Sequence, residues 1–396
     1  MKNKRKVLRN KSVLLGIAGG VSAYKSIDLI RRLREEGAHV TVVMTEAAKH
    51  FVTPLSLEVA SQNKVYGDLY SNPMAHISVP ADAEIMVVAP ATANTIGKFA
   101  HGIADDLLSL SFLSFRGPVV LAPAMNWRMY EHPIFQANLA TLRNIGVLQV
   151  GPEKGTLACG EEGIGRMAEI PDIIEALKSV FTTKDFADES VLVTAGPTRE
   201  YLDPVRFLSN RSSGKMGYAV AAAAQRRGAR VTLISGPSSL PHPKGVKVIS
   251  VDTASEMEQA VTSELASSTI LVMAAAVSDF MPAEKSGEKI NKSDAFMLAL
   301  TPTADIIAKA GLKENRPFIV GFAAETGKKP DKARKKLRDK QMDLVVFNDV
   351  TEAGCGFDVE TNKVVLIDKK QEIELPLLDK REVADAILDR ITELRA

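Results

Sequence analysis

The residue of this chain best suited to chemistry is Cys159, which lies in the segment 158–165, ACGEEGIG. A thiol acts as a nucleophile or a weak acid when its surroundings adjust its pKa. A lone cysteine is more often a small buried hydrophobe, but the three glycines and two glutamates of this segment make poor core material. We therefore expect Cys159 to lie on a glycine-rich flap rather than in a core.

Three loops in the first half of the chain are suited to hold a nucleotide. The turn Gly16–Gly20 follows an apolar stretch, and its glycines would let backbone N–H groups approach a phosphate. It lacks the G-x-G-x-x-G spacing, and the next apolar stretch ends in Met44 and Thr45 rather than in an acid, which favours a mononucleotide over NAD. Loops 89–95 and 123–129 offer small and amide groups that suit an isoalloxazine ring. The turn alone is equally typical of an ordinary strand–helix connection.

Two segments of the second half have the composition of an anion or nucleotide site. Residues 210–217, NRSSGKMG, precede an alanine-rich stretch and combine hydroxyls, glycines and a lysine. Residues 274–280, AAAVSDF, end a predicted strand with small side chains, and Asp279 could accept a hydrogen bond from a base or a ribose. An ordinary helix N-cap and a solvated turn are the alternative interpretations.

Lysines in two further places could meet phosphates. Lys289 lies in the polar loop 287–292, and Lys332, Lys336 and Lys340 recur at intervals of four, so they would share one helix face. A solvated surface is the alternative in both places. Acids interrupt the basic stretch and aromatic residues are missing from it, which argues against a nucleic-acid partner.

Alternating strands and helices are expected to position these loops. Predicted strands lie at Ser12–Ala18, His39–Met44, Glu84–Ala89 and Pro118–Ala122, and predicted helices at Ser22–Glu36, Thr92–Phe112 and Pro133–Asn144. The scheme restarts with strands at Ser190–Ala195, Val231–Ser235, Ile270–Ala275, Phe318–Phe322 and Leu344–Phe347, and a helix at Lys215–Arg227. Val364–Asp368 and Glu372–Leu375 are expected to add an antiparallel edge. Continuous apolar strands separated by helices predict a parallel sheet covered on both faces.

The predicted fold class is therefore α/β, with two doubly wound, mostly parallel Rossmann-like three-layer sheets in tandem. Residues 37–41, GAHVT, and 228–232, GARVT, mark the same point in each half. The polar segment Thr182–Glu189 is expected to link a domain of residues 1–189 to a domain of residues 190–396.

Length and composition agree with this organisation. A chain of 396 residues suggests two or three domains. A hydrophobic content of 45% and a charged content of 25% are typical of a soluble globular protein. The net charge of +2 gives no electrostatic case for a nucleic-acid or membrane partner. With two cysteines far apart, a disulfide framework and a Cys-only zinc site are excluded, and a reducing cytoplasm is the expected location.

The N-terminus superficially resembles a signal peptide, because Lys2, Lys4 and Arg5 come before the small, apolar run Val13–Ala23. That run contains the glycine turn, and the same local pattern recurs in mid-chain. No apolar stretch reaches the roughly 20 residues that a membrane span needs. We predict neither a signal peptide nor a membrane segment.

The motifs of the first half, taken together, resemble the flavin-dependent cysteine decarboxylase family. The similarity rests on Gly16–Gly20, Pro90–Thr95, Pro123–Met129 and Ala158–Met167 and covers most of residues 10–180. It implies that FMN binds between the subunits of a trimer. It also implies that the cysteinyl side of the substrate is oxidised to a thioaldehyde, loses its carboxylate as CO₂, and is reduced again to 4′-phosphopantetheine.

The same resemblance assigns roles to individual residues. His76 would be the base or orienting group during oxidation, Asn126 would hold the substrate carboxylate, and Cys159 would donate the final proton. The implied FMN contacts are Gly16, Gly19, Gly20, Ser22, Thr45, Ala91, Thr92, Asn94 and Met125. Ser22 and Thr45 are the candidates for the phosphate. Ala18 stands where many relatives carry a hydroxyl residue, and its methyl group cannot make that hydroxyl's hydrogen bond to the flavin.

The second half resembles the CTP-dependent phosphopantothenate–cysteine ligase over nearly its whole length. The motifs that carry this similarity are Thr194–Glu200, Ser209–Gly217, Ala275–Phe280, Gly321–Thr326 and Asn348–Val350. The resemblance implies that the carboxylate of 4′-phosphopantothenate attacks the α-phosphate of CTP, which gives an acyl-cytidylate and pyrophosphate. The amine of L-cysteine would then displace CMP.

The resemblance again assigns contacts in this half. Lys289 would stabilise the phosphoryl charge, with Mg²⁺ bound mainly through the CTP phosphates and its protein ligands left open. The implied CTP contacts are Met273, Ala274, Ala275, Asp279, Lys289, Ala304, Asp305, Ile306, Ile307, Phe322, Lys336 and Lys340. Asn210, Arg206 and Ala276 would bind phosphopantothenate, and Asn210 would also position the cytidylate. Asn291 and Ala304 replace the usual lysine and proline.

The chain is thus expected to be a bifunctional enzyme of coenzyme A synthesis that acts on small molecules. The family forms flavin-domain trimers and ligase dimers that combine into a dodecamer, so a homo-oligomer is expected. One alternative is an NAD-dependent oxidoreductase, which the missing acid after each second strand disfavours. A flavoprotein that only binds or regulates is the other, and it would lack the flap cysteine.

Overall fold

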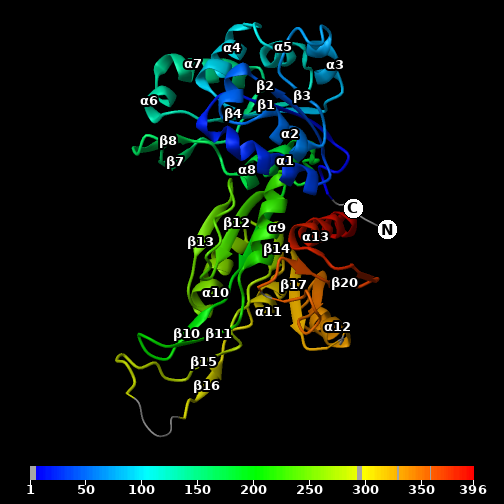
Figure 1. Cartoon of the computed structure of the whole chain (residues 1–396). Helices are drawn as coiled ribbons and strands as arrows, with labels where there is room; N and C mark the ends of the chain where they lie inside the picture. Colours follow the sequence, from blue (N-terminus) through cyan, green and yellow to red (C-terminus); the bar gives the residue numbers. More distant parts are fainter. Residues whose placement is uncertain (1–5, 292–296, 328–329, 357) are drawn as a thin grey trace. The chain divides into compact units, whose positions relative to one another are not determined.

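The structure, a computed structural model of the whole chain, describes residues 6–291, 297–327, 330–356 and 358–396 (Figure 1). Lys2, Lys4 and Arg5, and Lys292 of the polar loop, lie outside the described residues. The chain divides into two compact units, Met1–Thr182 and Thr183–Ala396. Each unit is described by itself. None of the helices in the described parts combines the length and apolar character needed to cross a bilayer.

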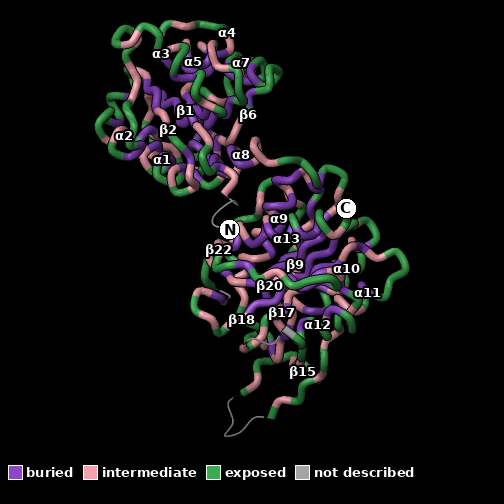
Figure 2. Tube along the Cα trace, turned by 90° about the vertical axis from the view of Figure 1, so that its right-hand side faces the viewer, coloured by how far each residue is buried: buried purple, intermediate pink, exposed green. Residues whose placement is uncertain are grey.

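The first unit is built on a parallel sheet with strand order β3-β2-β1-β4-β5-β6. The strands are β1 (Ser12–Ile17), β2 (His39–Met44), β3 (Val65–Tyr66), β4 (Ile85–Ala91), β5 (Val119–Pro123) and β6 (Leu148–Gln149). The sequence IMVVAPA of β4 is buried throughout, as expected of a central parallel strand covered on both faces. The buried stretches around β1, in the middle of the same sheet, can be followed in Figure 2.

Helices cover both faces of this sheet. Alternate residues of β1 point to opposite sides: Leu15 belongs to the core cluster that α1, α2 and α8 cover, whereas Leu14 belongs to the cluster that α3, α4, α5 and α7 cover. These helices are α1 (Ser26–Glu35), α2 (Pro54–Ser61), α3 (Ala75–Ala81), α4 (Ala93–His101), α5 (Leu107–Ser114), α7 (Pro133–Asn144) and α8 (Ile170–Phe181). The unit therefore has three layers, helix–sheet–helix.

The second unit repeats this architecture on an eight-stranded sheet of order β13-β12-β9-β14-β17-β18-β20-β21. The strands are β9 (Ser190–Ala195), β12 (Arg230–Ser235), β13 (Lys247–Ser250), β14 (Ile270–Met273), β17 (Phe318–Glu325), β18 (Leu344–Asp349), β20 (Val364–Asp368) and β21 (Glu372–Glu374). The first six in sheet order run parallel, and β20 and β21 add an antiparallel edge. Helices α9 (Lys215–Arg226) and α13 (Lys380–Arg395) cover one face, and α10 (Ala254–Leu265), α11 (Ile306–Gly311) and α12 (Pro330–Asp339) the other.

The predicted fold class is confirmed in both halves, and so is the antiparallel edge. The single helix predicted at Thr92–Phe112 is two helices in the structure, α4 and α5. Gly102 ends α4 in the left-handed conformation, and Asp106 opens α5 with a capping box to Ser109. The helix predicted to begin at Ser22 starts with a short 3₁₀ turn, η1 (Val21–Lys25), and becomes α-helical only at Ser26.

Two projections extend from the sheets. In the first unit, β7 (Glu153–Thr156) and β8 (Glu162–Arg166) form an antiparallel hairpin, and we call residues 153–166 the flap. In the second unit, β10 (Arg199–Tyr201) pairs with β11 (Phe207–Ser209), and β15 (Phe280–Pro282) pairs with β16 (Leu300–Pro302). Together they form an arm that leaves the sheet (Figure 1).

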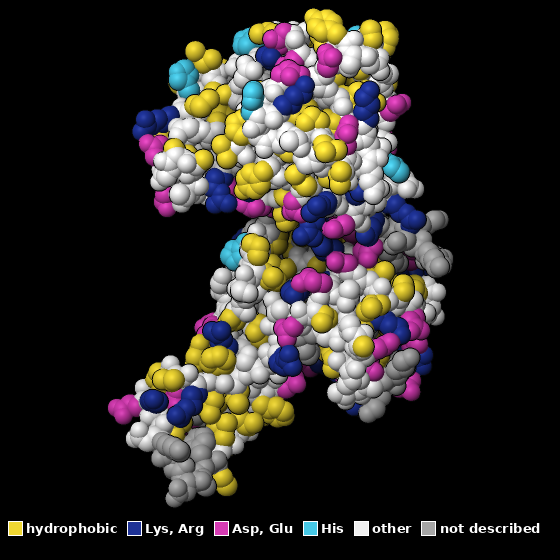
Figure 3. Space-filling view, viewed as in Figure 1, with side chains coloured by type: hydrophobic (Ala, Val, Ile, Leu, Met, Phe, Trp, Pro, Cys, Tyr) yellow, Lys and Arg dark blue, Asp and Glu magenta, His cyan; other side chains and the backbone are white. Residues whose placement is uncertain are grey.

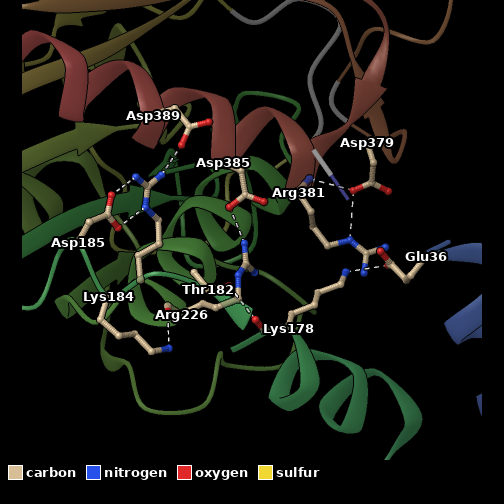
Figure 4. Close-up of polar contacts among 11 residues, drawn as sticks. Glu36, Lys178, Thr182, Lys184, Asp185, Arg226, Asp379, Arg381, Asp385 and Asp389 are labelled. Atoms are coloured by element: carbon tan, nitrogen blue, oxygen red, sulfur yellow. Dashed lines mark hydrogen bonds and ion pairs between the residues drawn. The ribbon is translucent and has the colours of Figure 1, made fainter. Parts of the chain in front are cut away.

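The segment interpreted as a linker, Thr182–Glu189, lies almost wholly in the second unit. Phe186 is 2% exposed and belongs to the core that α9 and α13 cover. The Arg227 guanidinium lies between Asp185 and Asp389, with its Nε 2.9 Å from Asp185 Oδ1 and its Nη1 2.7 Å from Asp389 Oδ1 (Figure 4). The division into compact units therefore falls between residues 182 and 183, a few residues before the predicted boundary between residues 189 and 190.

Candidate functional site

The first unit holds a cavity of about 1110 Å³ at the carboxyl ends of its parallel strands. Such a volume is ample for a nucleotide cofactor. The predicted residues that line it are Gly19, Gly20, Ser22, Thr45, Thr92, Asn94, Met125, Asn126 and Cys159. They come from the loops after β1, β2, β4 and β5 and from the flap. Parallel strands end at one edge of the sheet, which is why loops distant in sequence meet there.

One end of this cavity is suited to a phosphate. A Cβ on Gly19 would lie 2.5 Å from the Ala47 Cβ, so only glycine lets these two loops approach so closely. Thr45 and Thr92 are N-caps whose side-chain oxygens accept from Ala48 N and Thr95 N, each at 3.3 Å. Bare backbone, hydroxyls and the start of α4 together fit the phosphate and sugar of a mononucleotide.

Charged side chains also reach this cavity. Lys98 forms ion pairs of 2.7 Å with Asp105 and 2.8 Å with Asp106, and all three residues line the wall. Burial by itself would lower the pKa of Lys98, but the two carboxylates outweigh it and hold this pKa above its usual value. With one ammonium group against two carboxylates, this part of the wall has a net negative charge.

The flap places Cys159 against Asn126. Asn126 caps the short helix α6 (Trp127–Tyr130), since its Oδ1 accepts from Arg128 N at 2.9 Å. Its Nδ2 lies 3.3 Å from Cys159 Sγ. The flap can pack this closely because it has glycine at Gly163 and Gly165, where a Cβ would lie 2.6 Å from Trp127 Cβ and 2.1 Å from Met125 O. Cys159 is exposed, whereas Cys355 is buried.

Glu161 joins these groups and was missed by the sequence analysis. Its Oε2 accepts from Trp127 Nε1 at 2.8 Å, and its Oε1 accepts from Arg128 Nη2 at 2.7 Å. Hydrogen bonds from Trp127 and then Asn126 hold the pKa of Glu161 below its usual value, so the carboxylate is ionised at neutral pH. The only signal in the sequence was an acid beside the cysteine, which does not reveal where the flap folds.

Three predicted residues of the first unit are not among the described residues that line the cavity. Gly16 lies inside β1, where its missing side chain makes room for Leu108. Ala91 is fully buried at the end of β4. His76 is part of α3, and its Nδ1 is buried with no hydrogen-bond partner among the described residues. In one chain, therefore, His76 is not brought to Asn126 and Cys159.

The second unit holds a cavity of about 580 Å³, also at the carboxyl ends of parallel strands. Most of the predicted residues line it: Asn210, Met273, Ala274, Ala275, Ala276, Asp279, Ala304, Asp305, Ile306, Ile307, Phe322, Lys336 and Lys340. Asn210 Nδ2 donates to Val277 O at 3.0 Å, which fixes the segment 210–217 over the end of β14. The small residues that follow β14 leave room for a flat base beside the backbone.

Lysines converge on this second cavity. Lys336 pairs with Glu325 at 2.8 Å and holds the pKa of that carboxyl below its usual value, and Lys340 pairs with Asp305 at 2.8 Å. Lys215 and Lys380 also line the wall. Burial lowers the pKa of Lys380, whose Nζ donates to Gly356 O at 3.0 Å. These four lysines and Arg211 line one cavity, and such a group of cations suits a polyphosphate.

Arg206 and Lys289 are not among the described residues that line this cavity. Both belong to the arm, where Arg206 Nη1 donates to Ile290 O at 3.0 Å and the Asp203 carboxylate accepts from Ile290 N at 3.1 Å. Lys289 is exposed. Within the described residues, no group of three or more His, Cys, Asp or Glu side chains could hold a metal ion.

Comparison with known proteins places both units in one family. The Flavoprotein family model matches residues 1–182, and the DNA/pantothenate metabolism flavoprotein C-terminal domain model matches residues 186–394. The chain is 44% identical to the coenzyme A biosynthesis bifunctional protein CoaBC of Vibrio vulnificus and to that of Bacillus subtilis, with 98% of this chain and 98% of each relative covered. The chain belongs to the family of bifunctional coenzyme A biosynthesis proteins. The boundary between the two family models lies where the compact units divide.

Solved structures resemble each unit separately. The crystal structure of the C-terminal domain of a CoaBC protein is 38% identical, covers 53% of this chain and 96% of that chain, and has a TM-score of 0.46. A PPC decarboxylase mutant complexed with pantothenoylaminoethenethiol is 32% identical, covers 43% of this chain and 97% of that chain, and has a TM-score of 0.39.

Proposed function

We propose that this chain catalyses two consecutive steps of coenzyme A synthesis. The second unit couples 4′-phosphopantothenate to L-cysteine with CTP, and the first unit decarboxylates the product to 4′-phosphopantetheine with FMN. The observation that carries the proposal is the convergence of the predicted motifs on one cavity in each unit, in a chain that belongs to the bifunctional family.

In the first unit, the residues of the cavity fit FMN rather than a dinucleotide. Gly19, Gly20 and Ser22 would receive the phosphate, with Thr45 beside it, and Met125 and Asn94 would border the ring. When bound, FMN supplies the two-electron oxidation of the cysteinyl side of the substrate and the later return of both electrons. Asn126 would hold the carboxylate that leaves as CO₂, and Cys159 would deliver the last proton.

In the second unit, the lysines would hold the triphosphate of CTP while the carboxylate of phosphopantothenate attacks the α-phosphate. Pyrophosphate leaves as the acyl-cytidylate forms, and the amine of cysteine then attacks the acyl carbon and releases CMP. Mg²⁺ would bind through the phosphates. Asn210 lies at the mouth of the cavity, where it could position the acyl group.

Residues on the arm and on α3 would serve sites of neighbouring chains. Arg206 and Lys289 lie on a projection, and His76 lies on the surface helix α3. The first unit also exposes apolar side chains on and beside α2, where Phe51 is 46% exposed and Leu55 and Val59 are each 69% exposed (Figure 3). An apolar patch of this kind is typical of a subunit interface. A homo-oligomer would bury the patch and could bring these residues to a second copy.

The direct test is incubation of the purified protein with 4′-phosphopantothenate, L-cysteine, CTP and Mg²⁺, with products identified by mass spectrometry. We expect 4′-phosphopantothenoylcysteine and then 4′-phosphopantetheine, with CMP and pyrophosphate released. Denatured protein should release FMN. Release of FAD, or absence of the coupled product, would contradict the proposal.

A further inference from the structure

We propose that Glu161 is a positioning residue that occupies the amide of Asn126 until a substrate carboxylate displaces it, and thereby controls when Cys159 can act. This inference rests on the proposed decarboxylation. It concerns a residue of the flap that is not among the described residues lining the first cavity. The proposal stands on the hydrogen bonds between the flap and α6.

Both N–H donors of the Asn126 amide are already in use in this arrangement. Its Oδ1 accepts from Arg128 N at 2.9 Å. An amide nitrogen carries two N–H donors, and Asn126 Nδ2 lies 3.3 Å from Cys159 Sγ and 3.5 Å from Glu161 Oε2. A substrate carboxylate that binds Asn126 must therefore replace Glu161, the thiol, or both.

Glu161 can give way without the flap leaving α6. Of the three nitrogen donors that contact the Glu161 carboxylate, Asn126 is the most distant at 3.5 Å, whereas Trp127 and Arg128 lie at 2.8 and 2.7 Å. A carboxylate with two short anchors and one long contact can turn away from Asn126 and keep both anchors. The substrate carboxylate then takes a place already suited to a carboxylate, because Glu161 holds it in the free enzyme.

The position of Glu161 is linked to that of the thiol. Cys159 lies two residues before Glu161 on the flap, and its Sγ lies 3.8 Å from Glu161 Oε2. While the carboxylate of the substrate holds Asn126, the thiol loses its contact with the amide. Once CO₂ has left, Asn126 regains both contacts and draws the thiol back to the reacting carbon. The thiol would thus deliver its proton after decarboxylation and not before.

The test compares Glu161→Gln with Glu162→Gln, which removes the same charge one residue further along the flap. Glu162 is exposed, and within the described residues its carboxylate has no ion pair. The first measurement is the rate at which iodoacetamide alkylates Cys159 in the FMN-loaded enzyme without substrate, with buried Cys355 as the internal reference. We expect Glu161→Gln to raise the rate about tenfold, since a hydrogen bond to a charged group is lost, and Glu162→Gln to leave it unchanged.

The second measurement uses two unreactive probes, 4′-phosphopantothenoylserine, which has the carboxylate, and its ethanolamine counterpart, which lacks it. In Glu161→Gln the serine probe should bind severalfold more tightly, because a competing carboxylate has been removed from Asn126. The ethanolamine probe should bind with unchanged affinity. During turnover the variant should also accumulate the oxidised intermediate, and Glu161→Asp, which keeps the charge, should restore part of the wild-type behaviour.

The outcomes separate this inference from the proposed function. A wild-type enzyme that does not decarboxylate phosphopantothenoylcysteine would overturn the proposed function. An active wild type whose two glutamine variants alkylate alike and bind both probes alike would overturn the role of Glu161. A loss of affinity for both probes together with FMN would show that Glu161 only maintains the fold of the flap.

Discussion

At the scale of single residues, the flap brings Cys159 Sγ to 3.3 Å from Asn126 Nδ2, and the roles proposed for these two residues depend on that contact. We predict that Cys159→Ser still oxidises and decarboxylates phosphopantothenoylcysteine but does not complete the reduction, because an alcohol is a far weaker acid than a thiol. Mass spectrometry should find a product lighter than 4′-phosphopantetheine by two hydrogens. Full turnover by this variant would show that the thiol is structural.

Lys289 presents the opposite case, a residue predicted for catalysis that lies on the arm, away from the cavity of its own chain. We predict that Lys289→Gln loses formation of the acyl-cytidylate, by about 10²–10³ in rate, since the phosphoryl charge builds up in that step. The measurement is pyrophosphate release from CTP with phosphopantothenate present and cysteine omitted. Release at the wild-type rate in a single turnover would transfer the role to Lys336 or Lys340.

Mixing variants tests whether Lys289 acts on a neighbouring chain. Asn210→Ala damages the cavity and keeps the arm, whereas Lys289→Gln keeps the cavity and damages the arm. If the two variants are mixed equally and form dimers at random, about half of the dimers are mixed, and each of these has one site with both parts intact. The mixture should therefore regain about a quarter of the wild-type sites. Mixtures that remain inactive would indicate that Lys289 serves its own chain.

For single residues, the sequence could predict which ones lie at the ends of strands. It could not predict contacts that form only when the flap folds back onto the rest of the unit. Thr45, Thr92 and Asp279 follow buried strands, and parallel strands bring such positions to one edge. Glu161 escaped prediction because its partners, Trp127 and Arg128, lie 33 to 34 residues away and meet it only when the flap folds back. Gly16 was assigned to a cofactor, but the side chain that it accommodates is Leu108.

At the scale of elements, the packing of the flap places Cys159 against Asn126 in the first unit. Gly165 O accepts from Met125 N at 3.0 Å, and a Cβ on Gly165 would lie 2.1 Å from Met125 O. We predict that Gly165→Ala pushes the flap away from α6, lowers decarboxylation about a hundredfold and destabilises the first unit by about 1–3 kcal/mol. The ligase rate of the same protein should not change, because it depends on the second unit.

A matched substitution in the same unit controls for glycine replacement itself. At Gly97, inside α4, a Cβ would make only an ordinary contact of 3.7 Å with Asn138 Nδ2. Gly97→Ala should therefore keep decarboxylation and raise the free energy of unfolding by about 0.5–1 kcal/mol, since alanine is the better helix former. Equal losses of activity in both variants would show that the flap is not the sensitive element.

Elements with continuous apolar sequences were the easiest to predict. β2, β9, β20 and α7 have the predicted bounds. β9 and β20 are flanked directly by polar or glycine residues, which made their ends plain in the sequence. The break between α4 and α5 depends on a glycine in the left-handed conformation and on a capping box. Both are local signals that a continuous helical pattern conceals.

At the scale of the molecule, the chain is two folding units with separate cores. The clusters around β1 contain residues between Leu8 and Leu177, and the clusters around β9 contain residues between Phe186 and Ile391. Composition and polarity suggested a linker up to Glu189, since Thr182–Glu189 is a mostly polar stretch. Phe186 lies within this stretch, but its side chain is buried in the core of the second unit. The average polarity of the segment does not reveal one buried side chain.

The position of this boundary leads to a prediction about fragments. A fragment of residues 183–396 keeps Phe186, whose ring stacks 4.7 Å from the Arg227 guanidinium, and keeps the pair between Asp185 and Arg227. A fragment of residues 190–396 loses both and leaves Arg227, which is 8% exposed, with one of its two carboxylate partners. Loss of the buried aromatic ring should lower the free energy of unfolding by up to about 5 kcal/mol. Loss of one partner of the buried guanidinium should lower it by a similar amount.

We therefore expect the shorter fragment to unfold at a clearly lower urea concentration than the longer one, and the longer fragment alone to retain ligation of phosphopantothenate to cysteine. Residues 183–189 belong to the second unit, so fragments of residues 1–182 and 1–189 should unfold at the same concentration. The mutant Phe186→Ala in the longer fragment separates the ring from the rest of the segment, because it keeps Asp185 in place. If the two second-unit fragments are equally stable and the two first-unit fragments are not, then the segment belongs to the flavin unit and the domain boundary lies at Glu189.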